Sequence, residues 1–155
     1  MAGASSTQKG FTLVEAVIVI LILCIVTAMA IPGFQRMAVN GYLRAAARDL
    51  MADFSTLKQR AMSENIVYKV EFNDSEDLNH YRIKQKDGTT VQIKTPAIFG
   101  GTKIFSASFG SGKTITFQTR GISSAGHVVL VNSRDSRATI TVNFAGRTYV
   151  RFDFK

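Results

Sequence analysis

The chain has 155 residues, a net charge of +8 and a single cysteine, Cys24. Its length allows one modest domain beside a membrane-length segment, and one cysteine excludes both an intrachain disulfide and a cysteine-rich metal site. Residues 1–87 hold ten Lys/Arg and nine Asp/Glu, whereas residues 88–155 hold nine and two. This basic second half suggests an anionic partner such as nucleic acid, acidic protein or lipid headgroups, although it would equally serve solubility and docking to an acidic neighbour.

The first predicted element is the apolar run at residues 11–31, in which Glu15 is the one charged residue. As a helix rising about 1.5 Å per residue, this run would be about 30 Å long, which is enough to span a bilayer. A carboxylate inside such a span costs roughly 2.5 to 3.5 kcal/mol on insertion scales, so Glu15 needs a partner. The run offers no lysine or arginine. Snorkelling of Glu15 toward the headgroups is the simpler alternative.

The leader before this run, MAGASSTQKG, differs from an ordinary secretory signal. It has no acidic residue and places Lys9 and Gly10 directly against the apolar segment. An ordinary signal is instead cut at small residues after its apolar region, and Ala28-Met29-Ala30 is a less favoured site of that kind. The sequence KGFTLVE at residues 9–15 resembles the class III signal of type IV pilins and pseudopilins.

This resemblance implies that prepilin peptidase cuts between Gly10 and Phe11 and that the new N-terminal phenylalanine is methylated. It also makes Glu15 the fifth residue of the mature chain, and it places Pro32 where many pilins carry a helix-bending proline. A free amine at Phe11 could pair with Glu15 of the same or a neighbouring subunit when helices pack into a filament. We therefore expect Glu15 to be required for assembly and not for insertion.

A second helical stretch follows the apolar run. Pro32 and Gly33 predict a kink or a locally melted segment, since proline removes a backbone hydrogen bond and clashes with the preceding turn. Residues 34–64 then predict an amphipathic helix, because apolar residues recur at spacings of three and four: Leu43, Ala47, Leu50, Phe54, Leu57 and Ala61. A coiled coil would show the same stripe, but the strands that follow supply a sheet as a partner.

Alternating patterns after residue 65 predict a β-rich head. The expected strands cover residues 66–72, 80–85, 89–95, 114–118, 127–132, 137–143 and 147–154, with an acidic loop at 73–79 and a glycine-rich linker at 96–112. For the second and third strands we favour a three-residue loop ending in a left-handed Gly88, which pairs Ile83 with Val91 and Tyr81 with Ile93. A two-residue turn would instead set Ile83 opposite Gln92 and mix the two faces.

The last two strands predict a similar hairpin, with a three-residue loop at 144–146. This loop pairs Ile140 with Val150 and Ala138 with Phe152 on the inward face. The predicted outward pairs are Arg137 with Asp153, Thr139 with Arg151, Thr141 with Tyr149, and Asn143 with Arg147. Asp153 can neutralise Arg137 in this arrangement, whereas Arg147 and Arg151 have no acid across the ladder.

The sequence shows no catalytic or metal-binding pattern. His80 and His127 are isolated, and Ser124 and Asp135 form with His127 only the sort of triad that arises by chance. GSGKT at residues 110–114 fails as a phosphate-binding loop, because Ala107 stands where the first glycine should be and a β-rich sequence follows. We therefore expect a protein that is not an enzyme and has no metal and no cofactor.

The head as a whole has a diffuse family resemblance. A pilin helix followed by short strands, an Arg-Gly-Ile turn at residues 120–122 and a terminal hairpin with Gly146 and Arg147 resembles the H-type minor pseudopilins of type II secretion and the FimT and FimU minor pilins. The resemblance implies an α+β fold, with a long N-terminal helix packed on an antiparallel β head of two small sheets. The expected parts are a cleaved leader (1–10), a transmembrane and filament-core helix (11–33), an amphipathic helix (34–64) and a periplasmic head (65–155).

The function implied by this resemblance is that of a minor pilin or pseudopilin, a structural or priming subunit of a type IV pilus or type II secretion filament. Its expected partners are prepilin peptidase, other major and minor pilins or pseudopilins, and the bacterial inner membrane. A major filament subunit is a less favoured alternative.

DNA capture during uptake is the rival function. Some FimT-type pilins bind DNA through a basic C-terminal stretch resembling Gly-Arg-x-Arg; here Tyr149 replaces the second arginine. Arginines that flank an aromatic residue can contact phosphates and stack on bases. The candidate DNA-binding residues are Arg134, Arg147, Tyr149, Arg151 and Lys155. A solvated outer face of a sheet is the simpler alternative for them.

Overall fold

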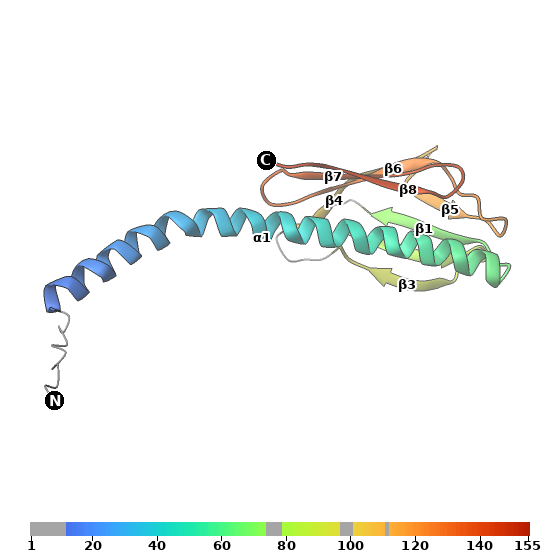
Figure 1. The fold of residues 1–155 in the computed structure, drawn as a ribbon. Coiled ribbons are helices and arrows are strands. Elements are labelled where there is room, and N and C mark those ends of the chain that lie inside the picture. The colour runs from blue at the N-terminus through green and yellow to red at the C-terminus, as the bar shows by residue number, and fades with distance from the viewer. Residues whose placement is uncertain (1–11, 74–78, 97–100, 111) are drawn as a thin grey trace, which may run out of the picture. The chain divides into compact units, whose positions relative to one another are not determined.

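The computed structural model describes residues 12–73, 79–96, 101–110 and 112–155 (Figure 1). The chain divides into two compact units, Met1–Arg36 and Met37–Lys155. Helix α1 (Leu13–Ser63) contributes to both units, and the second unit also holds strands β1 to β8.

In the first unit, α1 is apolar and exposed. An 18-residue window of the helix has a mean hydropathy of 2.9, and none of it is buried. By length and composition, α1 can therefore cross a membrane. The helix continues through Pro32 and Gly33 without interruption, so of the two predicted alternatives, a kink or a locally melted segment, the melted segment is wrong. Proline deletes a single intrahelical hydrogen bond, and a helix can continue past that loss.

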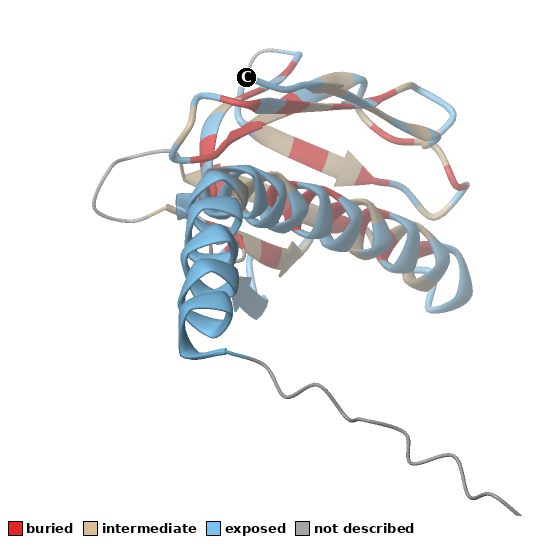
Figure 2. Cartoon of the chain, turned by 60° about the vertical axis from the view of Figure 1, so that its left-hand side comes forward, coloured by how far each residue is buried: buried red, intermediate tan, exposed pale blue. Residues whose placement is uncertain are grey.

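In the second unit, α1 carries the predicted apolar stripe, which appears in Figure 2 as buried residues alternating with exposed ones. The buried residues are Leu43, Ala46, Ala47, Leu50, Phe54, Leu57 and Ala61. The helix ends at Ser63, followed by Asn65 with a left-handed φ of 54°. A left-handed residue just past the last turn is a common way to stop a helix.

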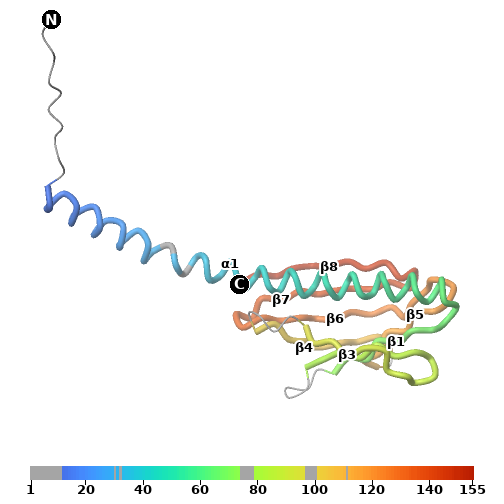
Figure 3. Tube along the Cα trace, turned by 90° about the horizontal axis from the view of Figure 1, so that it is seen from below, coloured from blue at the N-terminus to red at the C-terminus, as the bar shows by residue number. Residues whose placement is uncertain are grey.

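The head contains two antiparallel four-stranded sheets, as the resemblance implied. The first has the order β3-β2-β1-β5 and the second β4-β6-β7-β8. Both lie alongside the second half of α1 (Figures 1 and 3). The strands are β1 (Tyr68–Asn73), β2 (His80–Gln85), β3 (Thr90–Lys94), β4 (Lys103–Phe109), β5 (Thr114–Phe117), β6 (Gly126–Val131), β7 (Arg137–Val142) and β8 (Thr148–Asp153).

Strand β4 lies inside the segment that the sequence predicted as a linker, so that prediction is wrong. The register of β4 on β6 shifts between Ile104 and Ser106, and Ile104 and Ala107 are both buried although they are three residues apart. A β-bulge of this kind adds one residue and interrupts the period of two by which a strand is recognised. Residues 97–100 and 111 of that segment, and 74–78 of the expected acidic loop, lie outside the described residues.

The hairpin of β2 and β3 confirms the predicted loop but not the predicted pairs. The Gln85 N–H donates to the Thr89 carbonyl (2.9 Å), and Gly88 has a φ of 90°. A bulge then shifts the register, so Ile83 lies opposite Gln92 and Tyr81 opposite Lys94. The predicted partners, Val91 and Ile93, are 39% and 59% exposed. The shift instead turns Lys94 toward α1, where its Nζ lies 2.5 Å from Asp53 Oδ1.

The hairpin of β7 and β8 has the predicted register throughout. Ile140 lies opposite Val150 and Ala138 opposite Phe152. Gly146 in the loop has a φ of 68°, and the Asn143 N–H donates to the Arg147 carbonyl (3.0 Å). This register fixes which side chains of β8 point away from the core.

Candidate functional site

At the N-terminus, the described residues include Glu15 and Pro32 but not Gly10 and Phe11. Glu15 is exposed in the first turn of α1, and its N–H donates to the Thr12 hydroxyl (3.3 Å). A carboxylate there is favoured by the positive end of the helix dipole. Within residues 12–155 as described, no cation pairs with Glu15.

Three of the predicted residues share the outward face of the second sheet: Arg147, which directly precedes β8, and Tyr149 and Arg151 within it. Tyr149 lies opposite Thr141 and Arg151 opposite Thr139, so Arg147, Tyr149 and Arg151 follow one another along one side of the strand at about 7 Å intervals. Tyr149 is 55% exposed. The arrangement is a short row of two guanidinium groups with an aromatic ring between them.

The predicted neutralisation of Arg137 by Asp153 is wrong. The Arg137 guanidinium lies over the Phe105 ring, 4.8 Å from its centroid. Asp153 is instead nearest to Arg151, with Oδ1 3.7 Å from Nε, and both side chains are more than 60% exposed. Residues two apart on a strand share a face, so this contact competes with the one across the ladder. An ion pair so exposed contributes little and leaves Arg151 available to a ligand.

Arg134 and Lys155 lie at the other end of β8 from its hairpin loop. The turn after β6 is built on Asn132, whose Oδ1 accepts the N–H of Arg134 (3.0 Å), and the Lys155 N–H donates to the Ser136 hydroxyl (3.0 Å). The five predicted residues are therefore spread along the strand and do not form one cluster.

A further cation, which the sequence did not place at this site, lies beside Arg147. A groove between α1 and β8 is lined by Lys58 together with Arg147 and Tyr149. The Lys58 Nζ donates to the Ala145 carbonyl in the hairpin loop (2.8 Å). In the sequence, Lys58 is a charged residue outside the apolar stripe of the helix. No local pattern indicates that it contacts a loop 87 residues later in the chain.

The histidines do not form a catalytic arrangement among the described residues. Ser124 accepts a hydrogen bond from the Thr116 N–H (3.3 Å), and no hydrogen bond joins Ser124 or Asp135 to His127. His80 is 8% exposed, and its Nε2 has no hydrogen-bond partner. Among the residues that the structure describes, no group of three or more His, Cys, Asp and Glu side chains could hold a metal ion.

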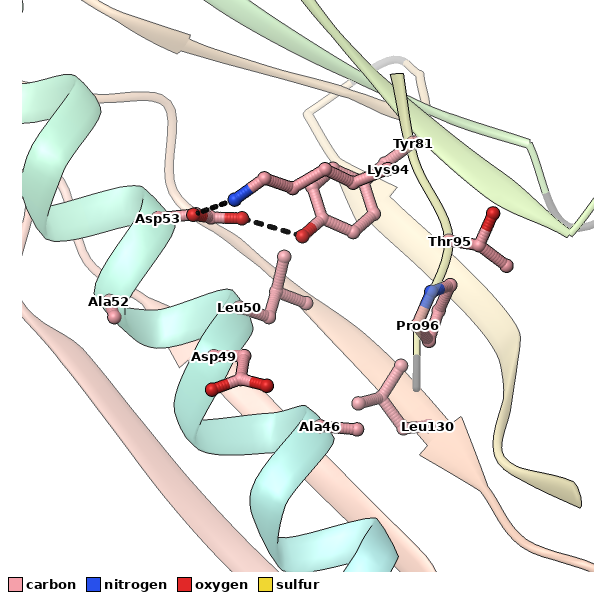
Figure 4. Close-up of a pocket in the computed structure, with 10 residues that line it drawn as sticks. All are labelled: Ala46, Asp49, Leu50, Ala52, Asp53, Tyr81, Lys94, Thr95, Pro96 and Leu130. Carbon is pink, nitrogen blue, oxygen red and sulfur yellow. Dashed lines mark hydrogen bonds and ion pairs between the residues drawn. The ribbon is translucent and has the colours of Figure 1, made fainter. Parts of the chain in front are cut away.

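A second hollow, of about 310 Å³, is lined by a different set of α1 residues and by strands of both sheets (Figure 4). Its lining residues come from α1, β2, the end of β3, the residues just after it, and β6: Ala46, Asp49, Leu50, Ala52, Asp53, Tyr81, Lys94, Thr95, Pro96 and Leu130. We refer to it below as the Asp49 pocket.

Asp53 is the centre of the polar contacts in the Asp49 pocket. Its Oδ2 accepts a hydrogen bond from the Tyr81 hydroxyl (2.6 Å), and its Oδ1 accepts one from the Lys94 Nζ (2.5 Å). Burial, and then the bond to the Asp53 carboxylate, raise the pKa of Tyr81 far above its ordinary value, so the hydroxyl stays protonated and donates. Asp49 lies one turn away on α1, and Figure 4 shows no hydrogen bond or ion pair to it.

Comparisons with known families and structures agree with this fold. The model described as type II transport protein GspH matches residues 46–146, and the prokaryotic N-terminal methylation motif matches residues 5–31. No curated protein matches the chain.

Two solved structures share the fold. The minor pseudopilin EpsH from the type 2 secretion system of Vibrio cholerae is 10% identical, with a TM-score of 0.55 over 71% of this chain and 96% of its own. The type IV minor pilin FimU of Pseudomonas aeruginosa is 13% identical, with a TM-score of 0.57 over 72% and 90%. These matches confirm the family resemblance that the sequence indicated. Because the GspH model matches more than half of the length of this chain, the chain belongs to the family of type II transport protein GspH.

Proposed function

We propose that this chain is a minor pilin or pseudopilin, a structural subunit that enters or primes a filament of a type IV pilus or a type II secretion system. It is not an enzyme in this proposal. It is inserted in the bacterial inner membrane with its head in the periplasm, and prepilin peptidase cuts it between Gly10 and Phe11 before methylation of the new N-terminus.

The proposal rests on the difference in burial between the two halves of α1. From Leu43 to Ala61 the helix buries a stripe of side chains in the head, whereas the large apolar side chains from Leu13 to Ile31 are about half exposed or more. Exposed apolar area costs about 25 cal/mol per Å² in water, so the first half requires an apolar environment. Lipid supplies it before assembly, and the corresponding helices of neighbouring subunits supply it in a filament.

Glu15 provides the test of assembly. We expect Glu15→Ala to reach the membrane and to be processed like the parent chain, since the substitution removes a charge from the apolar segment and so cannot hinder its insertion. We expect the same variant to be nearly absent from filaments, because the free amine at Phe11 would lose its counter-charge. The measurement is an immunoblot of membrane and sheared-filament fractions. Val17→Ala is the matched control, and undiminished Glu15→Ala in filaments would contradict the role.

DNA capture is a second candidate function, favoured by the arrangement of β8. Arg147, Tyr149 and Arg151 share one exposed face, and Lys58 lies beside Arg147 in the groove next to them. Guanidinium groups at strand spacing can contact successive phosphates while the exposed ring stacks on a base. In this proposal Arg134 and Lys155 extend the contact toward the far end of the strand.

The measurement is fluorescence anisotropy of labelled duplex DNA with the full-length chain in detergent, over a series of salt concentrations. We expect Arg147→Ala/Arg151→Ala to weaken binding and to reduce the slope of log K against log salt by about 1.8, because two phosphate contacts are lost. Lys86→Ala/Lys103→Ala removes the same charge from exposed positions off β8, since Lys86 lies in the β2–β3 loop and Lys103 on β4 at the opposite edge of the sheet, and it should leave the slope almost unchanged. Equal losses in both double variants, or no binding at low salt, would leave the outward face of β8 as a solvent or docking surface.

A further inference from the structure

We propose that the Asp49 pocket receives an arginine side chain from a neighbouring subunit of the filament. The proposal rests on the filament role proposed above and adds to it a defined contact between heads. It is based on the charge, the lining and the size of the pocket.

The charges of the Asp49 pocket do not balance. Asp53 is satisfied, since both of its oxygens are engaged by Tyr81 and Lys94. Asp49 lies four residues earlier on the same side of α1, and like charges at this spacing destabilise a helix. Among the described residues, Asp49 has no ion pair. Asp53 and Lys94 thus neutralise each other, whereas Asp49 is exposed and presents an unpaired carboxylate at the pocket, in a chain whose net charge is +8. This carboxylate is available to a cation that a partner brings.

The lining of the pocket suits a cation carried on an apolar stem. Leu50 and Leu130 are buried at 2% and 0% exposure and form part of its wall, with Ala46 and Pro96 beside them. The methylene groups of a long basic side chain can pack on such a wall while its charged end reaches a carboxylate. Arginine fits better than lysine, because a guanidinium is more weakly hydrated and can bind a carboxylate through two parallel hydrogen bonds.

The size and charge of the pocket also indicate that the arginine belongs to a protein. A volume of about 310 Å³ accommodates one long side chain but not a folded segment. A free amino acid would carry two charged backbone groups, an α-ammonium and an α-carboxylate, for which the described lining supplies no matched pair of partners. An arginine within a polypeptide has neither group, so a side chain offered by a packed neighbour is the better occupant.

The test is a titration of the full-length ¹⁵N-labelled chain in detergent with N-acetyl-L-arginine N-methylamide, followed by amide chemical shifts. We expect saturable changes in the millimolar range, centred on Asp49, Leu50 and Thr95. We expect Asp49→Asn to weaken binding about fivefold, the effect of losing one partly exposed ion pair. Asp153→Asn is the matched control, since it removes one carboxylate from an exposed site elsewhere, and it should bind like the parent.

Two further probes separate arginine from simpler occupants. The lysine analogue should bind more weakly than the arginine analogue, and the norleucine analogue weaker still. Equal binding of norleucine would show that the pocket is merely apolar, equal binding of lysine would overturn the assignment to arginine, and unchanged affinity of Asp49→Asn would overturn the role of its carboxylate. The amide spectrum of Asp49→Asn reports whether this variant is folded.

Incorporation into filaments tests the contact between subunits. We expect Asp49→Asn to be processed normally and to enter sheared filaments less efficiently than Asp153→Asn. If the arginine analogue binds but the two variants enter filaments equally, the pocket is not a subunit contact. Failure of the filament role itself would appear instead in the Glu15→Ala experiment, whereas the titration needs no filament.

Discussion

Replacing Phe54 by alanine is expected to lower the free energy of unfolding of the head by about 3 to 5 kcal/mol. Phe54 is 1% exposed on the inner face of α1. Its ring lies 6.2 Å from the ring of Phe72 on β1 and 5.8 Å from that of Phe117 on β5, measured between centroids. Alanine would leave a cavity between a helix and two strands that are fixed by their own hydrogen bonds and cannot easily close the gap.

The measurement is urea denaturation of the full-length chain in detergent, followed by near-ultraviolet circular dichroism. Tyrosine and phenylalanine provide that signal, because the chain has no tryptophan. Phe144→Ala is the matched control, since Phe144 is 64% exposed and its removal should change stability by less than about 0.5 kcal/mol. A loss below about 1 kcal/mol for Phe54→Ala would mean that α1 is not the centre of this core.

The two hairpins show how far the sequence could predict pairing. In both, a three-residue loop was predicted and is present, and each loop ends in a left-handed glycine, which was predicted for Gly88 and is also found at Gly146. In the β7–β8 hairpin the loop also determines every pair, because inward and outward residues alternate without a break. In the β2–β3 hairpin a bulge after the turn changes the pairs. The bulge brings Lys94 to Asp53, a residue 41 positions away, and no local pattern contains that contact.

The same difference, between local patterns and contacts of residues far apart in the sequence, decides which of the sites could be predicted. The residues on the outward face of β8 could be predicted because they depend only on the length of one hairpin loop and on the alternation of side chains along a strand. The Asp49 pocket could not, since its lining comes from α1, β2, β6 and the residues around Lys94, which meet only in the folded head. The N-terminal methylation motif is a short linear signal and needs no fold, so the sequence was sufficient to find it.

Gly126→Ala is expected to destabilise the head by about 3 kcal/mol, the upper part of the usual range for overpacking. Gly126 begins β6 and pairs with Phe109 of β4. A Cβ at this position would lie 2.2 Å from the Ser108 carbonyl oxygen and 2.8 Å from Phe109 Cα. Both are backbone atoms of the adjacent strand, so the overlap cannot be relieved by rotating a side chain, and the end of the β4–β6 ladder must separate.

The effect of that separation reaches the other sheet. Phe109 is 3% exposed and stacks on Phe72 of β1, with ring centroids 5.7 Å apart. Moving the backbone of Phe109 therefore disturbs one of the aromatic contacts between the two sheets. Gly112→Ala is the control, since a Cβ there meets nothing within 4 Å and should leave stability unchanged or raise it slightly. If urea denaturation gave the two alanine variants the same unfolding free energy, β4 would not be tightly paired to β6 at this end of the ladder.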